Sequence, residues 1–82
     1  MVVKTEQIQE KIKNIIQELL DKEGLSNKED LTMQGLDSIS SIELIVELEE
    51  VFSISFDDSE LLLDNFKTID LIEKMIESKT NV

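Results

Sequence analysis

The first part of the chain has apolar residues at the spacing of an amphipathic α-helix. They recur at intervals of three and four positions, which places them on one side of a helix with about 3.6 residues per turn. We therefore predict a helix over about residues 4–21, ended by Gly24 in a left-handed conformation. Its apolar positions are Ile8, Ile12, Ile15, Ile16, Leu19 and Leu20.

A long connection is expected over residues 23–37. Ser26 and Glu29 have the spacing of a capping box, which predicts a brief turn within it. A loop of about fifteen residues is long for so short a chain, and such loops are often functional. The side chains expected to anchor it on a core are Leu25, Leu31, Met33 and Leu36.

The second half of the chain predicts three further helices. One extends from Ser38 to about Phe52 and is followed by a short link over residues 53–58. Asp57 or Asp58 is then expected to cap a short helix over about residues 59–64. Thr68 is a suitable N-cap for a last helix that continues to about Ser78. The apolar positions of this last helix are Ile69, Leu71, Ile72, Met75 and Ile76.

The composition favours an all-α fold. The 82 residues include no Pro and only two Gly, and they are rich in Leu, Ile, Glu and Lys. We predict one domain over residues 1–82, a small bundle of three long helices and one short helix. There is no Cys, so no disulfide supports the fold, and the composition suits a reducing, cytoplasmic compartment. No apolar run approaches the ~20 residues needed to cross a bilayer.

The predicted helix from Ser38 to Phe52 has two apolar sides. At 100° per residue, one side has the pattern of a core stripe. The other side has three apolar residues surrounded by acids, and it suits either burial against the first or last helix or an exposed docking patch. The core stripe contains Leu44, Leu48 and Phe52, with Ile45 and Val51 beside it. The second side contains Ile39, Ile42 and Val46, with Glu43, Glu49 and Glu50 around them.

Negative charge is concentrated in the middle of the chain. The net charge is −11, and residues 29–64 contain eleven acids and no Lys or Arg. Such a surface repels nucleic acid and anionic membranes and favours positively charged protein partners. The plainer interpretation is a solvated surface that keeps a small monomer soluble. Asp57, Asp58 and Glu60 lack the spacing of a calcium loop, so no metal site is expected.

Ser38 has three possible roles. As an enzyme nucleophile it is poorly supported, because the chain has no His to act as a base and no G-x-S-x-G turn. As a helix N-cap it is reasonable, although Asp37 could cap the helix equally well. As an attachment point it would place a phosphate ester at the positive end of a helix dipole, beside the apolar patch.

The run "GLDSISSIELIVELEEVFSISF" closely resembles the central motif of acyl carrier proteins and related phosphopantetheine-binding carrier domains. The similarity continues through "DNFKTIDLIEKMI", and it covers about residues 31–76. The resemblance implies a four-helix carrier fold in which Ser38 receives 4′-phosphopantetheine from coenzyme A. A Mg²⁺-dependent phosphopantetheinyl transferase would attach the arm, with Asp37 helping to position that enzyme and its metal.

The resemblance also implies a function without catalysis. The arm would hold acyl or aminoacyl groups as thioesters for loading and condensing enzymes with basic surfaces. Ser40 stands where bacterial fatty-acid carriers usually have an acid, and the link reads Phe56-Asp57-Asp58 where they often have Ile-Pro-Asp. Ser40 weakens the case for a general fatty-acid carrier, and the stretch "NFKTID" resembles discrete carriers of polyketide, nonribosomal-peptide or other specialised acyl pathways. The alternative is an unmodified acidic adaptor, with Ser38 as a plain cap. The resemblance implies docking through Ile39, Ile42, Glu43, Val46 and Glu50, and the helical pattern adds Glu49 to these predicted docking residues.

Overall fold

The computed structural model describes residues 5–80, and these form only helices and connections. The all-α class is confirmed. The elements are the α-helices α1 (Thr5–Leu20), α2 (Ser38–Phe52) and α3 (Ile69–Thr80), with the 3-10 helices η1 (Leu31–Gln34), η2 (Asp58–Glu60) and η3 (Leu63–Phe66). Within these residues, no helix combines the length and apolar character that crossing a membrane requires.

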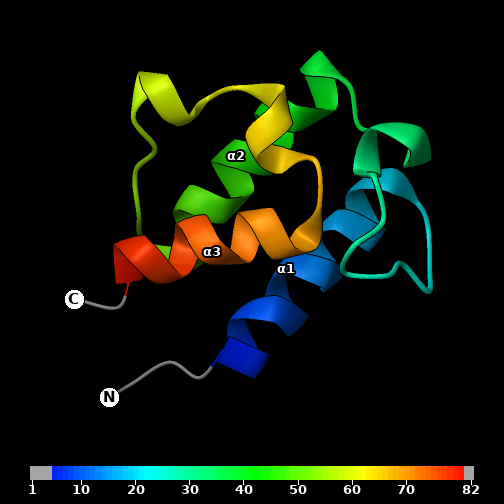
Figure 1. The fold of residues 1–82 in the computed structure, drawn as a ribbon, viewed down its shortest axis with the longest axis horizontal. Helices are drawn as coiled ribbons and strands as arrows, with labels where there is room; N and C mark the ends of the chain where they lie inside the picture. Colours follow the sequence, from blue (N-terminus) through cyan, green and yellow to red (C-terminus); the bar gives the residue numbers. More distant parts are fainter. Residues whose placement is uncertain (1–4, 81–82) are drawn as a thin grey trace.

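The three α-helices pack around one core, as Figure 1 shows. α3 lies in front of α2 in this view, and the chain between them arches over the top of the molecule with η2 and η3. The start of α1 and the end of α3 lie on the same side. The buried apolar side chains are Ile8, Ile12, Ile16, Leu25, Leu31, Leu36, Leu44, Leu48, Phe56, Phe66, Ile69, Ile72 and Ile76.

The end of α1 differs from the prediction. The left-handed residue that ends the helix is Asp21, with a φ of 55°, and not Gly24. Asp21 N–H donates to Glu18 C=O at 3.4 Å, and Lys22 N–H donates to Gln17 C=O at 2.9 Å. This is the pair of bonds of a Schellman motif, in which Asp can take the left-handed position. Gly24 also has a positive φ, but it lies within the following loop.

The long connection contains η1, which was not predicted. Asp30 caps η1, because its side chain accepts from Thr32 N–H at 2.9 Å. Gly35 ends it with a φ of 114°. The predicted anchors Leu25, Leu31 and Leu36 are buried, whereas Met33 is 80% exposed and that prediction was wrong. The tight turn of η1 directs Leu31 inward, so the residue two positions later points to solvent.

The predicted short helix over 59–64 is replaced by η2 and η3. Leu62 between them has extended backbone angles, with φ −105° and ψ 137°. The aromatic rings on either side of this segment, Phe56 and Phe66, are both buried and meet edge to face at 5.5 Å between centroids. A continuous helix would not bring both ends of the segment to the same place in the core, so packing overrides helix propensity here.

The last helix agrees with the prediction at its start. Thr68 Oγ1 accepts from Leu71 N–H at 3.1 Å, which is the bond of an N-cap. The helix continues to Thr80, two residues beyond the predicted end.

Candidate functional site

Asp37 caps the N-terminus of α2. Its Oδ1 accepts from Ile39 N–H at 3.0 Å and from Ser40 N–H at 2.8 Å. Ser40 Oγ in turn accepts from Asp37 N–H at 2.9 Å, which completes a capping box. The donated bonds from the Ser40 backbone and then its hydroxyl lower the pKa of Asp37 below its usual value of 3.8. Asp37 is therefore ionised at neutral pH.

Ser38 follows the cap as the first residue of α2. It is exposed, and its hydroxyl forms no hydrogen bond with any residue between 5 and 80. Only its backbone carbonyl is engaged, accepting from Ser41 Oγ at 2.9 Å. The capping role that the sequence left open between Ser38 and Asp37 thus belongs to Asp37, and the Ser38 hydroxyl is left without a structural task.

The second apolar side of α2 is exposed. Ile39, Ile42 and Val46 are 74%, 62% and 48% exposed. Burial against α1 or α3, one of the two interpretations of these residues, is therefore wrong. Glu43 and Glu50 are also exposed on this side, so an apolar centre with acids around it lies directly beside Ser38. The core stripe is confirmed by Leu44 and Leu48, which are fully buried, whereas Val51, expected beside it, is 42% exposed.

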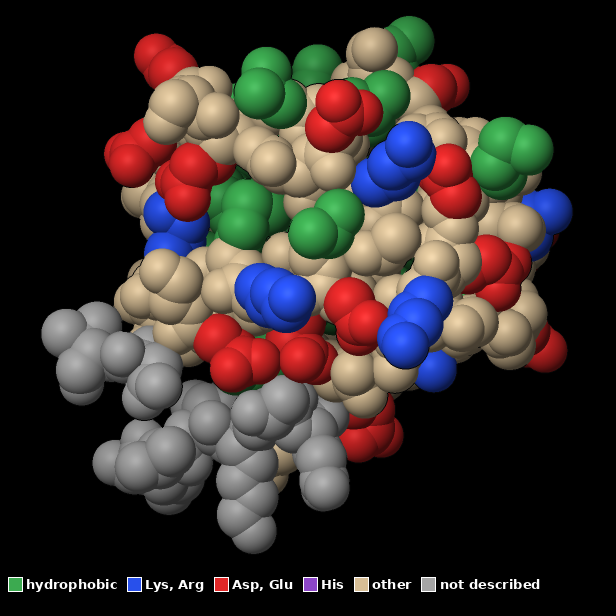
Figure 2. Space-filling model, in the orientation of Figure 1, with side chains coloured by type: hydrophobic (Ala, Val, Ile, Leu, Met, Phe, Trp, Pro, Cys, Tyr) green, Lys and Arg blue, Asp and Glu red, His purple; other side chains and the backbone are tan. Residues whose placement is uncertain are grey.

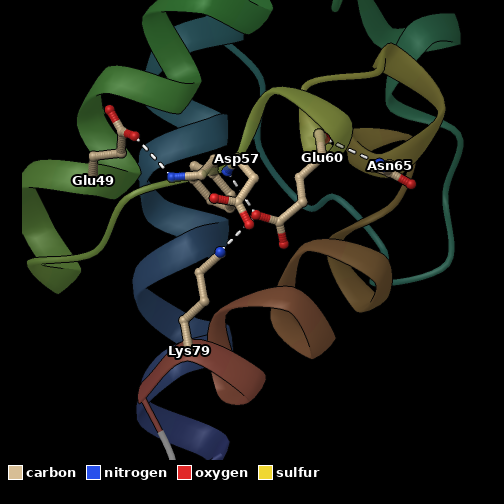
Figure 3. Close-up of polar contacts among 6 residues, drawn as sticks. Glu49, Asp57, Glu60, Asn65 and Lys79 are labelled. Atoms are coloured by element: carbon tan, nitrogen blue, oxygen red, sulfur yellow. Dashed lines mark hydrogen bonds and ion pairs between the residues drawn. The ribbon is translucent and has the colours of Figure 1, made fainter.

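Glu49 has a contact that the pattern of α2 did not predict. It is half-buried, and its Oε2 accepts from Phe56 N–H at 3.0 Å (Figure 3). This bond ties the chain that leaves α2 back to the helix. Glu49 therefore differs from Glu43 and Glu50, which are free to face a partner.

A second group of contacts holds the chain between α2 and α3. Lys79 Nζ lies 2.6 Å from Glu60 Oε1 and 5.3 Å from the centroid of the Phe56 ring. The same Glu60 oxygen accepts from Asp57 N–H at 2.8 Å, and Glu60 C=O accepts from Asn65 Nδ2 at 3.0 Å (Figure 3). We call this group, with Glu49, the link clasp.

The link clasp was not predicted, because Glu60 and Lys79 are nineteen residues apart. The only local signal was the Asp57–Glu60 spacing. The Lys79 ammonium, followed by the Asp57 N–H, lowers the pKa of Glu60 below its usual value. Within the residues described, no group of three or more potential ligands is arranged to hold a metal ion.

Comparisons with known proteins identify the family. The family model described as "Phosphopantetheine attachment site" matches residues 10–76. A protein of Phytoplasma australiense named acyl carrier protein is 40% identical over 74 residues, which cover 83% of this chain and 91% of that protein. Another of the same name, from Onion yellows phytoplasma (strain OY-M), is 43% identical over 53 residues, or 65% of this chain and 63% of that protein.

The chain belongs to the acyl carrier protein family. It is a carrier protein and not an enzyme, and its prosthetic group is a covalently attached 4′-phosphopantetheine. Its partners accordingly include a phosphopantetheinyl transferase and enzymes that handle acyl groups. A chain without Cys can thus use a thiol, because the cofactor supplies it.

Proposed function

We propose that the Ser38 Oγ carries the phosphopantetheine arm of this acyl carrier protein. The observation that supports this most strongly is that the residue that caps α2 is not the serine itself. Asp37 forms the helix cap, so the adjacent Ser38 hydroxyl is exposed and free of hydrogen bonds to the described residues. A modifying enzyme could therefore reach it and form a phosphate ester without breaking the cap.

The surroundings of Ser38 suit a phosphate ester. It would lie at the N-terminus of a 15-residue helix, where the helix dipole favours an anion. The N–H groups of Ile39 and Ser40 are already bonded to Asp37, so they are not available to the phosphate. The ionised Asp37 carboxylate next to the serine suits the positioning of a transferase and its Mg²⁺, and that metal belongs to the enzyme.

In this proposal the whole chain, residues 1–82, is a single carrier domain that holds acyl or aminoacyl groups as thioesters. It presents them to enzymes of a fatty-acid, polyketide or nonribosomal-peptide type pathway. The names of both relatives favour acyl cargo. Ser40, which departs from the common pattern, completes the capping box with Asp37. Its hydroxyl also donates to the Asp37 carboxylate at 2.9 Å, a bond that an ionised acid at the same position could not donate.

The exposed side of α2 is the proposed docking surface. Loading enzymes, condensing enzymes and the transferase would contact the apolar centre of Ile39, Ile42 and Val46, with basic groups against Glu43 and Glu50. Exposed charge pairs are screened over about 8–10 Å at physiological ionic strength, so affinity for the transferase should fall as salt rises. Affinity that stays constant from low to high salt would remove the acids as docking determinants.

The test of Ser38 is a mass measurement. Incubation with coenzyme A and a promiscuous phosphopantetheinyl transferase should add the mass of one phosphopantetheine to the wild type. Ser38→Ala should show no addition, whereas Ser55→Ala, which removes another exposed serine, should be modified like the wild type. A wild type that several transferases fail to modify, or a Ser38→Ala variant that is still modified, would overturn the proposal.

The alternative function is an unmodified acidic adaptor that docks a basic partner. The same exposed patch supports it, since an apolar centre with an acidic rim suits binding with or without an arm. Under the adaptor hypothesis, Ser38→Ala would leave partner binding and cellular function intact. Loss of function in Ser38→Ala with unchanged folding would separate the two.

A further inference from the structure

A groove lies between α1 and α2, next to the proposed docking surface. Its volume is about 630 Å³, and it is open to solvent along one side. Ile15 and Leu19 of α1 are half-buried and form part of its lining. Ile42 and Val46 of α2 line it from the opposite side and also belong to the docking surface, so the groove extends that surface onto α1.

Three acids share the lining with these apolar side chains. They are Glu18 of α1 and Glu43 and Glu47 of α2, and all three are exposed. None forms an ion pair with a described residue, because the ion pairs found there are Lys67–Asp30 and Lys79–Glu60. The groove therefore combines apolar side chains with carboxylates that form no ion pair with a described residue.

This combination restricts what can cover the groove. Phosphate-bearing surfaces are repelled by the carboxylates. A carried acyl chain would use the apolar side chains but leave the carboxylates without a partner. A second copy brings its own net charge of −11 against three carboxylates. A helix with an apolar face and flanking Lys or Arg residues matches both features, and helices commonly bind in such grooves through residues at i, i+3 or i+4, and i+7.

We propose that this groove binds a basic amphipathic helix of a partner enzyme, with Ile15, Glu18 and Leu19 of α1 forming one wall. The inference rests on the proposed carrier function and adds α1, together with Glu47, to the docking residues predicted on α2. A helix of about three turns is long enough to follow the groove past Ile42 and Val46, at about 5.4 Å per turn.

The experiment uses a synthetic amphipathic peptide of about four helical turns. It has Leu on one face, Lys on both flanks and a single Trp. The protein has no Trp or Tyr, so the peptide fluorescence reports binding without background. We expect saturable binding that weakens with salt. The amide NMR signals of Ile15, Leu19, Ile42 and Val46 should shift. A peptide with Glu in place of Lys should not bind.

Matched charge reversals on α1 test the position of the site. Glu18→Lys should weaken peptide binding about fivefold, the effect expected from replacing an exposed attraction by a repulsion. Glu10→Lys makes the same charge change at an exposed position outside the groove, and it should change the affinity less than about twofold. Equal effects of the two variants would show only a general attraction to the acidic protein and would overturn the proposal.

The remaining outcomes separate the other occupants. Concentration-dependent dimerisation with NMR shifts in the groove would assign it to a second copy. Shifts in the groove when an acyl group is loaded on the arm, without peptide, would assign it to cargo. Either result overturns the proposal. If the wild type is modified at Ser38 but no peptide binds, only this inference fails. If the peptide binds but Ser38 is not modified, the carrier assignment to Ser38 fails alone.

Discussion

The side-chain contacts at the two ends of α2 differ strongly in range. At the N-terminal end, the Asp37 carboxylate bonds only to described residues two and three positions away. At the C-terminal end, the chain is held by Glu49 to Phe56, seven residues apart, and by Glu60 to Lys79, nineteen apart. The start of α2 thus forms its cap from local sequence alone and leaves Ser38 free, while the following link depends on α3.

This difference also appears on the surface. Hydrophobic side chains are exposed on the upper half of the face in Figure 2, over the region of η2 and η3. Leu61, Leu62 and Leu63 are 41%, 60% and 36% exposed there. Because these three leucines remain exposed, they add little burial energy that would fix the position of the segment. Its position therefore depends on Phe56, Phe66 and the link clasp. Cutting those contacts should affect the link far more than comparable changes affect the start of α2.

The largest effect is expected for Phe66→Ala. Phe66 is 1% exposed and packs edge to face on Phe56, so its removal should lower the free energy of unfolding by about 3–5 kcal/mol. For a chain of this length that is a large part of the total stability. Thermal unfolding followed by circular dichroism measures the loss. Leu62→Ala, which removes an exposed side chain on the same segment, should cost less than about 0.5 kcal/mol. Similar losses would mean that the link is not held by its aromatic contacts.

Lys79→Met tests the link clasp. Methionine keeps an unbranched apolar stem against Phe56 but removes the charge that bonds to Glu60. We expect the Tm to fall by about 8 °C, because a charged hydrogen bond in a partly buried place is lost. Lys67→Met is the control. Its ion pair with Asp30 is longer, at 3.9 Å, and more exposed, so it should lower the Tm by less than about 2 °C. Equal shifts would remove the distinction between the two pairs.

Two variants at the start of α2 separate the residue that stabilises the helix from the residue proposed for modification. They are Asp37→Ala and Ser38→Ala. Asp37→Ala removes the cap and should lower the Tm of the unmodified protein by about 5 °C. Ser38→Ala removes a hydroxyl without hydrogen bonds to the described residues and should change the Tm by less than about 2 °C, although we expect it to abolish modification. A larger loss in Ser38→Ala than in Asp37→Ala would reverse the assignment of the cap.

Acid should weaken the Asp37 cap. Its pKa is lowered in the folded protein, so its contribution to stability is present above its usual value of 3.8 and is lost as pH falls through the folded pKa. The difference in Tm between wild type and Asp37→Ala should therefore shrink toward zero at the lowest pH at which the fold persists. A difference that stays constant down to that pH would contradict the hydrogen bonds to Ile39 and Ser40.

Local patterns predicted the elements that depend on local contacts. The bounds of α2 and the cap by Thr68 follow from local spacing. For the second face of α2, the sequence left burial and exposure open, and the structure shows that it is exposed. The sequence allowed either Asp37 or Ser38 as the N-cap of α2, and local spacing does not distinguish between them. The resemblance of the motif around Ser38 then led to the carrier family, which periodicity alone does not reveal.

The errors lie where distant contacts or rare backbone conformations decide. The link forms η2 and η3 because Phe56 and Phe66 meet in the core, and the sequence between them has no signal for that meeting. The residues that end α1 and α2 in a left-handed conformation are Asp21 and Ser53. In a sequence, only glycine indicates this conformation clearly, so these two positions could not be predicted. The α1 wall of the groove was missed for the same reason, since it needs the relative position of two helices.

The smallest predicted effect concerns Glu73 of α3, which lies outside both ends of α2. Burial, and after it the nearby Glu77 and Asp70 carboxylates, raise the pKa of Glu73 above its usual value of 4.5, while Gln9 acts in the opposite direction. The folded state therefore holds this proton more tightly, and the stability from Glu73 falls as pH rises from 4.5 through the folded pKa. Glu73→Gln should raise the Tm by about 2 °C at neutral pH.

The pH dependence of the Tm gain of Glu73→Gln tests the role of its charge more directly than the size of the gain. Glutamine resembles the protonated acid, so the gain should vanish below about pH 4, where Glu73 is protonated in both folded and unfolded chains. Glu23→Gln, the same change at an exposed loop position, is the matched control. The sign is opposite to that of Asp37 and Glu60, whose contributions are lost in acid. A gain that persists at low pH would show that Glu73 acts through packing and not through its charge. Acid unfolding would then reflect the loss of the Asp37 and Glu60 contributions, without an opposing contribution from Glu73.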